Sequence, residues 1–103
     1  MRDQAMRDPN FVKMFEEDTS RYYEGLLKDG LKQGYGSIVL ENGDKYEGQW
    51  EGGMRHGFGV MRFQTGDVYT GHFHKGKEHG QGRKEFMCGD IYTGEWKDGR
   101  GTG

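Results

Sequence analysis

In several short segments of this chain, apolar and polar residues alternate with the period of two that is typical of a β-strand. In residues 46–51 the aromatic and glycine positions share one face of the expected strand, and glutamate and glutamine occupy the other. The glycine-rich residues 52–57 predict a turn, because glycine permits the positive φ angles that tight turns need. The chain then returns over residues 58–63, with Phe63 as the expected core residue, so the pattern predicts a β-hairpin.

The same hairpin pattern recurs with a period of 23 residues. Residues 46–68 align with residues 69–91 and with residues 23–45, and a fourth, partial copy covers residues 92–103. Each copy contains a tyrosine, a glycine two positions later, and a large apolar residue two positions after that. These residues are Tyr23, Tyr46, Tyr69 and Tyr92; Gly25, Gly48, Gly71 and Gly94; and Leu27, Trp50, Phe73 and Trp96. Such a fixed period is typical of repeat proteins, in which each unit packs on its neighbours.

The connections between copies share a Gly-Asp pair, at residues 43–44, 66–67 and 89–90. We expect each of these tight turns to fold the next hairpin back beside the previous one. The sequence therefore predicts a mainly β fold, an elongated single antiparallel sheet of consecutive hairpins. Its seven strands would span roughly 30 Å at about 4.8 Å per strand.

Recurring glycines on the apolar face indicate how a single sheet can bury its aromatic residues. An aromatic ring such as Trp50, Phe63 or Tyr69 is expected to lie flat across glycine backbone, so that ring-on-glycine stacking replaces a second layer. The glycines expected to have this structural role are Gly25, Gly48, Gly59, Gly71, Gly82 and Gly94.

Residues 1–22 lack the repeat and predict a short amphipathic helix. Asp8 suits the N-cap and Pro9 the first helical position, and Phe11, Met14 and Phe15 share one helical face. Two roles are open for this helix. It covers the exposed first strand as a terminal cap, or it docks to a partner.

The composition indicates an ordered but thin fold in a reducing compartment. Only 31% of the 103 residues are apolar, while the 20 glycines recur in register with the aromatic positions. The net charge of −2 gives no attraction to a phosphate backbone, so nucleic acid is not expected as a partner. No segment approaches the roughly 20 apolar residues of a transmembrane helix, and the polar start does not resemble a secretory signal. With a lone Cys88, we expect a cytoplasmic protein.

No catalytic constellation emerges from the sequence. Cys88 has no recurring histidine or acid beside it. His72 and His74 form a His-x-His pair close to His79, which is one pattern for a metal site. His79, however, shares its repeat position with His56, which has no such pair, so we favour a turn residue that bonds to backbone. The sequence predicts no enzymatic activity, no cofactor and no metal.

Charge differs between the two ends of the expected hairpins. The turns within repeats carry seven basic and four acidic residues, a net charge of +3, and the turns between repeats carry one basic and four acidic residues, a net charge of −3. A basic edge could make weak contact with anionic lipid headgroups. The plainer interpretation is that these charges keep the protein soluble.

The motif Tyr-x-Gly-x-Trp-x-x-Gly-x-x-His-Gly-x-Gly runs from Tyr46 to Gly59 and recurs from Tyr69 to Gly82, with Phe73 in place of tryptophan. Over residues 23–103 the chain closely resembles MORN (membrane occupation and recognition nexus) repeats. The resemblance implies a string of β-hairpins that do not themselves catalyse a reaction. MORN repeats serve as scaffolds in cytoskeletal, ciliary and membrane-contact proteins, and as appendages of some lipid kinases and lysine methyltransferases.

The terminal copies depart from the motif. In the first copy Leu27 replaces the aromatic residue and Gln33 the histidine, as expected of an atypical terminal repeat. The last copy stops before its return strand. Either the sheet ends on an open edge, which invites homo-association with another chain, or the chain is a segment of a longer array.

We therefore expect a non-enzymatic scaffold or adaptor that binds a protein partner, an amphipathic helix, in a cytoskeletal or ciliary assembly. Packing of the rings on the chain's own glycines competes for the same sheet face. The alternatives are a peripheral phospholipid-binding module and an accessory domain of a larger lipid kinase or lysine methyltransferase. The candidate partner-binding residues are Tyr46, Trp50, Phe63, Tyr69, Phe73, Phe86, Tyr92 and Trp96.

Overall fold

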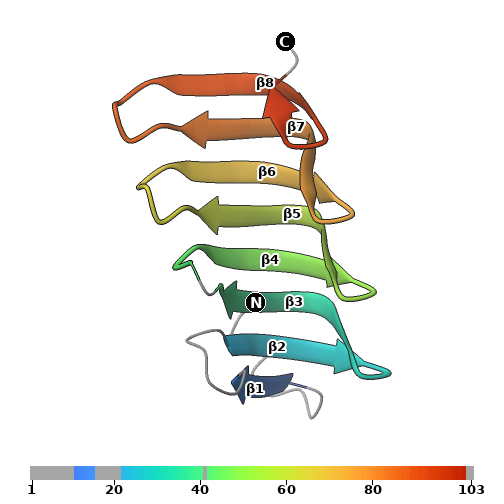
Figure 1. Cartoon of the computed structure of the whole chain (residues 1–103). Helices are drawn as coiled ribbons and strands as arrows, with labels where there is room; N and C mark the ends of the chain where they lie inside the picture. The colour runs from blue at the N-terminus through green and yellow to red at the C-terminus, as the bar shows by residue number, and fades with distance from the viewer. Residues whose placement is uncertain (1–10, 16–21, 41, 102–103) are drawn as a thin grey trace.

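A computed structural model describes residues 11–15, 22–40 and 42–101, and all the regular structure in these ranges is β-strand. Within these described ranges, nine strands form one antiparallel sheet in which chain neighbours are also sheet neighbours (Figure 1). The molecule measures 41 × 26 × 23 Å, so the predicted elongated sheet of consecutive hairpins is confirmed. The strands are β1 (Phe11–Phe15), β2 (Tyr22–Lys28), β3 (Leu31–Val39), β4 (Lys45–Glu51), β5 (Met54–Arg62), β6 (Val68–His74), β7 (Lys77–Glu85), β8 (Ile91–Lys97) and β9 (Arg100–Gly101).

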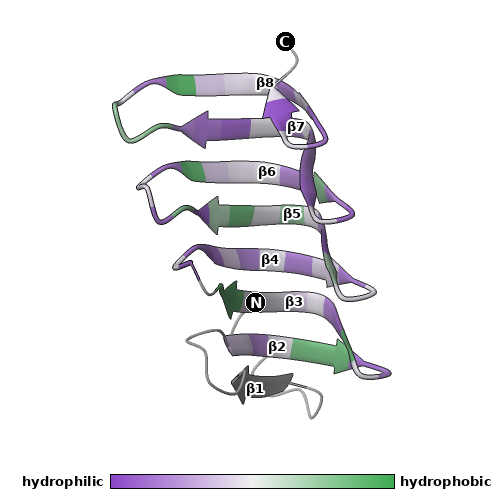
Figure 2. Ribbon diagram, viewed as in Figure 1, coloured by the Kyte–Doolittle hydropathy of each residue, from purple (hydrophilic) through white to green (hydrophobic). Residues whose placement is uncertain are grey.

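The buried residues line one face of this sheet. Met61, only 3% exposed, stands between the paired positions Tyr46 and Tyr69. Phe63, the residue expected to be central, lies beyond the end of β5 and is only partly buried. Apolar colour is concentrated in β2, β3 and β5, whereas the end of β7 is hydrophilic (Figure 2). Over residues 22–40 and 42–101, the buried hydrophobic residues are Tyr23, Tyr46, Trp50, Met61, Tyr69, Phe73 and Trp96.

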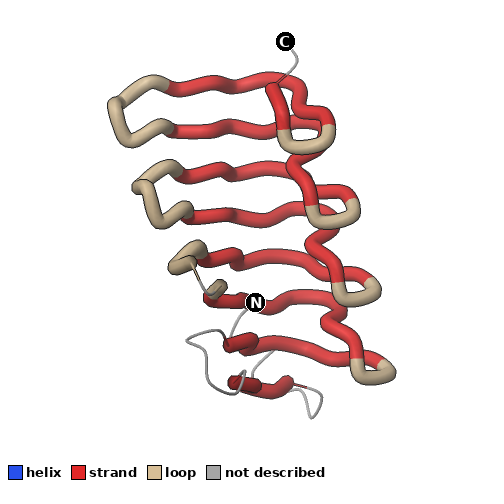
Figure 3. Tube along the Cα trace, in the orientation of Figure 1, coloured by secondary structure: helices blue, strands red, loops and turns tan. Residues whose placement is uncertain are grey.

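The turns within repeats are shorter than the sequence suggested (Figure 3). Gly52 and Gly53 have φ angles of 58° and 86°, and positive φ at both central residues is typical of a type I′ hairpin turn. Strand β5 therefore begins at Met54, and the expected six-residue turn over residues 52–57 is wrong. Gly57, with φ of 80°, lies inside β5, and the strand pairing shifts register between Gly48 and Trp50.

The turns between repeats hold one another through their aspartates. The backbone N–H of Leu40 donates to the Asp44 carbonyl at 2.8 Å and closes the first of these turns. The Asp44 carboxylate accepts from the Gln64 backbone N–H at 2.8 Å, and Asp67 accepts in the same way from Met87 at 2.8 Å. The acidic residues at this edge of the sheet thus tie each turn to the next one.

Residues Phe11–Phe15 form strand β1, which pairs antiparallel with β2 and places Phe11 opposite Leu26. The predicted helix is therefore wrong over these residues, and the rest of its span, residues 8–10 and 16–17, lies outside the described residues. A strand satisfies the edge N–H and C=O groups of β2, which a helix cannot do, and phenylalanine and valine favour strands. At the other end, β9 adds a two-residue return strand that the sequence did not predict.

Tyrosine rings lie directly over the paired glycines. A Cβ atom at Gly48 would lie 2.7 Å from the Tyr46 hydroxyl, and one at Gly59 would lie 2.5 Å from Tyr46 Cε1. Both distances are too short for any side chain, so glycine is required at these positions. Stacking of Tyr69 on its glycines was expected, whereas the rings nearest to Gly48 and Gly59 do not include those of Trp50 or Phe63. Tyrosine suits the position because its hydroxyl can also reach a backbone carbonyl three residues later.

Candidate partner-binding face

We call the side of the sheet that carries Tyr23, Tyr46, Tyr69 and Tyr92 the ring face. On it Tyr46 and Tyr69 each meet two neighbouring rings edge to face. The Tyr46 centroid lies 5.2 Å from that of Trp50 and 5.0 Å from that of Phe73. The next tyrosine repeats this geometry, with Tyr69 lying 5.1 Å from Phe73 and 5.0 Å from Trp96. Edge-to-face contacts are a favourable arrangement of aromatic rings. The rings thus form a continuous ladder across the repeats.

Hydrogen bonds fix the rings of this ladder. The Tyr46 hydroxyl donates to the Gln49 carbonyl at 2.7 Å, and the indole Nε1–H of Trp50 donates to the Gly36 carbonyl at 3.0 Å. The same tyrosine bond recurs at Tyr23, Tyr69 and Tyr92, and the same tryptophan bond recurs at Trp96. Every polar atom that these rings bury therefore has a backbone partner.

The eight residues predicted to bind a partner divide into two groups. Tyr46 and Tyr69 are fully buried and Trp50, Phe73 and Trp96 nearly so, which makes these five part of the core of the sheet. The partly exposed residues of the set, which a partner could reach more directly, are Phe63, Phe86 and Tyr92. Ring packing thus occupies much of the face, as the competing interpretation expected.

Two rows of partly exposed side chains follow the repeat on this face. The apolar row consists of Leu40, Phe63 and Phe86, and the charged row consists of Lys32, Arg55 and Glu78. Side chains of both rows line a hollow of about 250 Å³, whose wall includes Lys32, Leu40, Trp50 and Arg55. All three charged residues lie in strands, whereas the sequence predicts them in turns because the predicted turns are too long. The period of 23 residues alone could have revealed both rows.

The cations of the charged row lie over the aromatic ladder. The Arg55 guanidinium carbon lies 5.9 Å from the Tyr46 centroid and 5.7 Å from that of Phe73. Its Nη2 donates to the Gly76 carbonyl at 2.6 Å, and burial lowers the pKa of the Arg55 guanidinium. Lys32 Nζ lies 5.3 Å from the Tyr23 centroid and 5.7 Å from that of Trp50. Each cation thus sits over one edge-to-face ring pair.

Comparison with known protein families agrees with this geometry. The MORN repeat profile matches residues 23–45, 46–68, 69–87 and 92–103, which together make up most of the chain. The chain belongs to the MORN repeat family. A comparison with curated proteins finds no match. Membership of this typically non-catalytic family is consistent with a scaffold or binding module.

We number the MORN repeats 1 to 4, beginning at Tyr23, Tyr46, Tyr69 and Tyr92. Burial raises the pKa of the Tyr23 hydroxyl to about 12 and raises that of Tyr46 further above its usual range. Burial, with a smaller contribution from the Glu78 carboxylate, raises the pKa of Tyr69 to about 12. These hydroxyls are therefore neutral hydrogen-bond donors at physiological pH.

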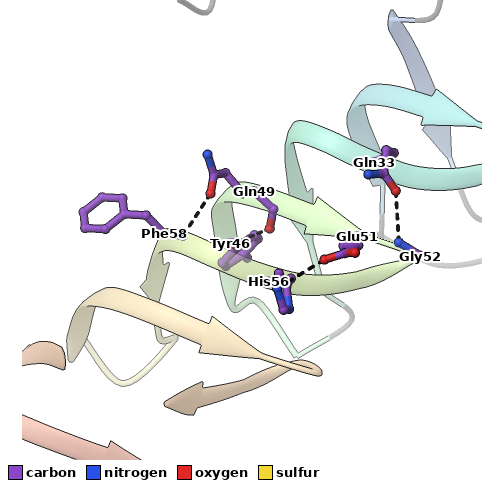
Figure 4. A network of polar contacts seen from close by, with 7 residues as sticks. All are labelled: Gln33, Tyr46, Gln49, Glu51, Gly52, His56 and Phe58. Atoms are coloured by element: carbon purple, nitrogen blue, oxygen red, sulfur yellow. Dashed lines mark hydrogen bonds and ion pairs between the residues drawn. The ribbon is translucent and has the colours of Figure 1, made fainter. Parts of the chain in front are cut away.

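Polar contacts of MORN repeat 2 are drawn in Figure 4. The Gln49 side-chain carbonyl accepts from the Phe58 backbone N–H at 3.2 Å. His56 Nε2 lies 3.2 Å from a carboxylate oxygen of Glu51. Gln33 reaches from repeat 1 to accept from the Gly52 N–H at 3.1 Å, which joins the two repeats.

Three of the four histidines lie in a row across neighbouring strands. The rings of His56, His74 and His79 lie in a row, with centroids 5.4 Å and 5.3 Å apart, while His72 packs edge-on against Phe58. No group of histidine, cysteine and acidic residues suited to a metal occurs in the described ranges. The view of His79 as a turn residue bonding to backbone is wrong: it lies in β7, and its buried Nδ1 has no hydrogen-bond partner among the described residues. Over residues 11–15, 22–40 and 42–101, no helix is long and apolar enough to cross a membrane.

Proposed function

We propose that this MORN array is a non-enzymatic scaffold whose ring face binds an amphipathic helix of a partner protein. The observation that carries the proposal is the pair of partly exposed rows, one apolar and one charged, that run across the repeats on one sheet face. An amphipathic helix presents a matching pair of stripes.

The spacing of the repeats suits such a helix. Equivalent positions of successive repeats lie two strands apart, or roughly 9.6 Å at about 4.8 Å per strand. A helix rises about 1.5 Å per residue, so seven residues advance it by about 10.5 Å and by nearly two full turns. A helix laid across the strands would therefore meet repeats 1, 2 and 3 with residues i, i+7 and i+14 of one face.

The chemistry of the two rows sets the expected pattern of the partner. Its apolar stripe would pack on Leu40, Phe63 and Phe86, and its polar flank would face Lys32, Arg55 and Glu78. Acidic side chains opposite the first two positions complement their charge. We place this partner in a cytoskeletal or ciliary assembly because MORN repeats serve as scaffolds there.

Photo-crosslinking from each sheet face tests this proposal. A benzoylphenylalanine at position 63 reports on the ring face, and one at position 58 reports on the opposite face, where Phe58 is 51% exposed. The two variants are expressed in the source cells, and the captured peptides are identified by mass spectrometry. We expect position 63 to capture segments with apolar residues at i, i+3, i+4 and i+7, and position 58 not to capture them.

Two further proteins, one double variant and one control variant, test the affinity for the captured segment. Phe63→Ser with Phe86→Ser should weaken binding of the captured segment at least about tenfold, while Phe58→Ser should leave it unchanged. Thermal melting of each variant confirms that the sheet is folded. Capture from position 58 alone, or of segments without the helical pattern, would refute the proposed function.

A further inference from the structure

The third position of the charged row breaks the pattern of the first two. In MORN repeats 1 and 2, Lys32 lies over the ring pair Tyr23 and Trp50, and Arg55 lies over the pair Tyr46 and Phe73. The equivalent ring pair of repeat 3, Tyr69 and Trp96, has nearly the geometry of Tyr46 and Phe73: 5.0 Å and 81° against 5.0 Å and 85°. The equivalent residue of repeat 3, however, is Glu78.

Backbone register and side-chain reach both place Glu78 where Arg55 stands one repeat earlier. Arg55 is paired with Trp50 across its hairpin, and Glu78 is paired with Phe73. Arg55 Nη2 lies 3.8 Å from where a Cβ would stand on Gly76, and Glu78 Oε1 lies 3.6 Å from the corresponding point on Gly99. Each of the two side chains thus ends beside the equivalent turn of the repeat that follows it.

Among the described residues, no cation lies over the Tyr69 or Trp96 ring, and no hydrogen bond or ion pair reaches the Glu78 carboxylate. Lys84 is also on this face, but its ammonium lies over Phe63 and Phe86, at 4.8 Å and 5.1 Å from their centroids. The Glu78 carboxylate and the Arg55 guanidinium attract each other at a distance, since Glu78 raises the pKa of Arg55 against the effect of burial. Beyond that attraction, a half-buried carboxylate next to aromatic rings lacks the direct ring contact that stabilises the cations of repeats 1 and 2.

We propose that Glu78, Tyr69 and Trp96 form a recognition site for the guanidinium of an arginine side chain on the partner helix. We call this site the third slot, and its biological use rests on the function proposed above. A guanidinium can bind the carboxylate through two parallel N–H donors and lie against the rings at the same time. A further N–H would reach the Gly99 carbonyl, as Arg55 reaches that of Gly76.

The arginine would enter from the exposed side of the ring pair. Trp96 is 6% exposed and Tyr69 fully buried, so the guanidinium would first meet Glu78 and Trp96. Contact with Tyr69 requires the flexible Glu78 side chain to turn aside. A lysine would fit less well, because its ammonium cannot make the two parallel bonds.

The third slot also gives the bound helix a direction. Lys32 and Arg55 favour acidic residues opposite repeats 1 and 2, and Glu78 favours an arginine opposite repeat 3. The helix that fits carries its arginine seven residues beyond the acid that faces Arg55. A helix laid in the reverse direction would place like charges together, and this repulsion would select against it.

The two tryptophans allow a direct test in the intact chain. Trp50 belongs to the pair already covered by Lys32, and Trp96 belongs to the third slot, so their indole N–H signals in a ¹⁵N-resolved NMR spectrum report on both sites. The probe is N-acetyl-arginine methylamide, and the matched control is the uncharged citrulline analogue. We expect saturable movement of the Trp96 signal with the arginine probe alone, and no movement of the Trp50 signal.

Three variants complete the test. Glu78→Gln should weaken the apparent affinity of the probe about tenfold, and Glu78→Arg should abolish binding by filling the slot. Lys32→Glu should create the same arrangement over Tyr23 and Trp50, so that the Trp50 signal begins to move. A Trp96 signal that does not move, or that responds equally to citrulline or in Glu78→Gln, overturns the proposal. Crosslinking from position 63 does not require Glu78, so failure of the slot and failure of the proposed function give different results.

Discussion

MORN repeats 2 and 3 have the same strand pairing and equivalent tyrosine and glycine positions but present different chemistry to a partner. Gly48 pairs with Gly59 in repeat 2 as Gly71 pairs with Gly82 in repeat 3, and each hairpin shifts register directly afterwards. Their tyrosine hydroxyls make the same backbone bond, at 2.7 Å and 2.8 Å.

Between these shared positions, the two repeats carry different side chains on the ring face. Repeat 2 carries Arg55 and Met61 where repeat 3 carries Glu78 and Lys84, and part of β5 is apolar in colour where β7 is hydrophilic (Figure 2). Glycine and tyrosine positions therefore maintain the hairpin, while the positions between them are free to set charge. In this molecule stability and recognition are assigned to different residues of one repeat.

The largest expected effect comes from the positions that both repeats share. Gly59→Val and Gly82→Val should each lower the free energy of unfolding by about 3 kcal/mol, because the added side chain runs into a buried tyrosine ring. Urea unfolding followed by circular dichroism measures this loss. Arg83→Val is the control, since Arg83 is the exposed neighbour of Gly82 and should change stability by only about 0.5 kcal/mol. A Gly82→Val protein as stable as Arg83→Val would show that ring-on-glycine packing is not required.

Reversing the charge at the equivalent positions Arg55 and Glu78 should affect the stability of repeats 2 and 3 differently. Arg55→Glu should cost about 2 kcal/mol of stability, because it removes the bond to the Gly76 carbonyl and the cation over two rings. Glu78→Arg should change stability by less than about 1 kcal/mol, because the cation added over Tyr69 and Trp96 is offset by loss of the attraction between the Glu78 carboxylate and Arg55. Lys75→Glu, an exposed change in the turn between β6 and β7, should have little effect. Equal losses from Arg55→Glu and Glu78→Arg would contradict the difference between the repeats.

Removing single tyrosine hydroxyls tests how much the equivalent hydrogen bond of each repeat contributes to stability. Tyr46→Phe and Tyr69→Phe should each lose about 1 kcal/mol, the usual value of one hydrogen bond, with the ring packing kept. Tyr92→Phe should lose less, because the bond of Tyr92 is longer, at 3.0 Å, and exposed. The three values come from the same urea titration. A loss at Tyr92 that exceeds the other two would be inconsistent with burial of the ladder.

Raising the pH should not lower the free energy of unfolding until the pH reaches about 10, where tyrosines of an unfolded chain ionise. Tyrosines in an unfolded chain titrate near pH 10, whereas burial raises the pKa of Tyr23 and Tyr69 to about 12. The raised pKa means that this stabilisation is complete below about pH 10 and is lost as pH rises towards about 12. Absorbance at 295 nm should show a late class of tyrosines that ionise together with unfolding. If all six tyrosines ionised near pH 10 in the folded protein, the tyrosine ladder would not be buried.

Much of the fold could be predicted because its determinants recur in the sequence. The 23-residue period and the alternation of Tyr46, Gly48 and Trp50 are enough to predict hairpins, their order and the buried face. Residues 11–15 were harder, because Phe11, Met14 and Phe15 suit a helical face while the segment also suits a strand. These residues form a strand because they pair with β2. That pairing cannot be seen in any local sequence pattern.

The candidate site could be predicted less well. Met61 and Phe63 have the same parity, and only the end of β5 at Arg62 explains why Met61 is the buried one. The pair Gly52 and Gly53 suits a two-residue hairpin turn, but Gly57 extends the predicted turn over residues 52–57 and so places Arg55 in it. Its position over two rings depends on strand pairing across the hairpin, which periodicity alone does not give.

The most direct test of separate stability and recognition positions is a charge-reversal cycle between Glu78 and the arginine of the helix captured from position 63. Isothermal titration calorimetry gives the affinity of each of the four combinations. We expect Glu78→Arg or arginine to glutamate in the helix to weaken binding at least about tenfold, and the double reversal to restore it to within about threefold. If the double reversal weakened binding by as much as the two single reversals added together, that result would contradict the pairing of Glu78 with the arginine.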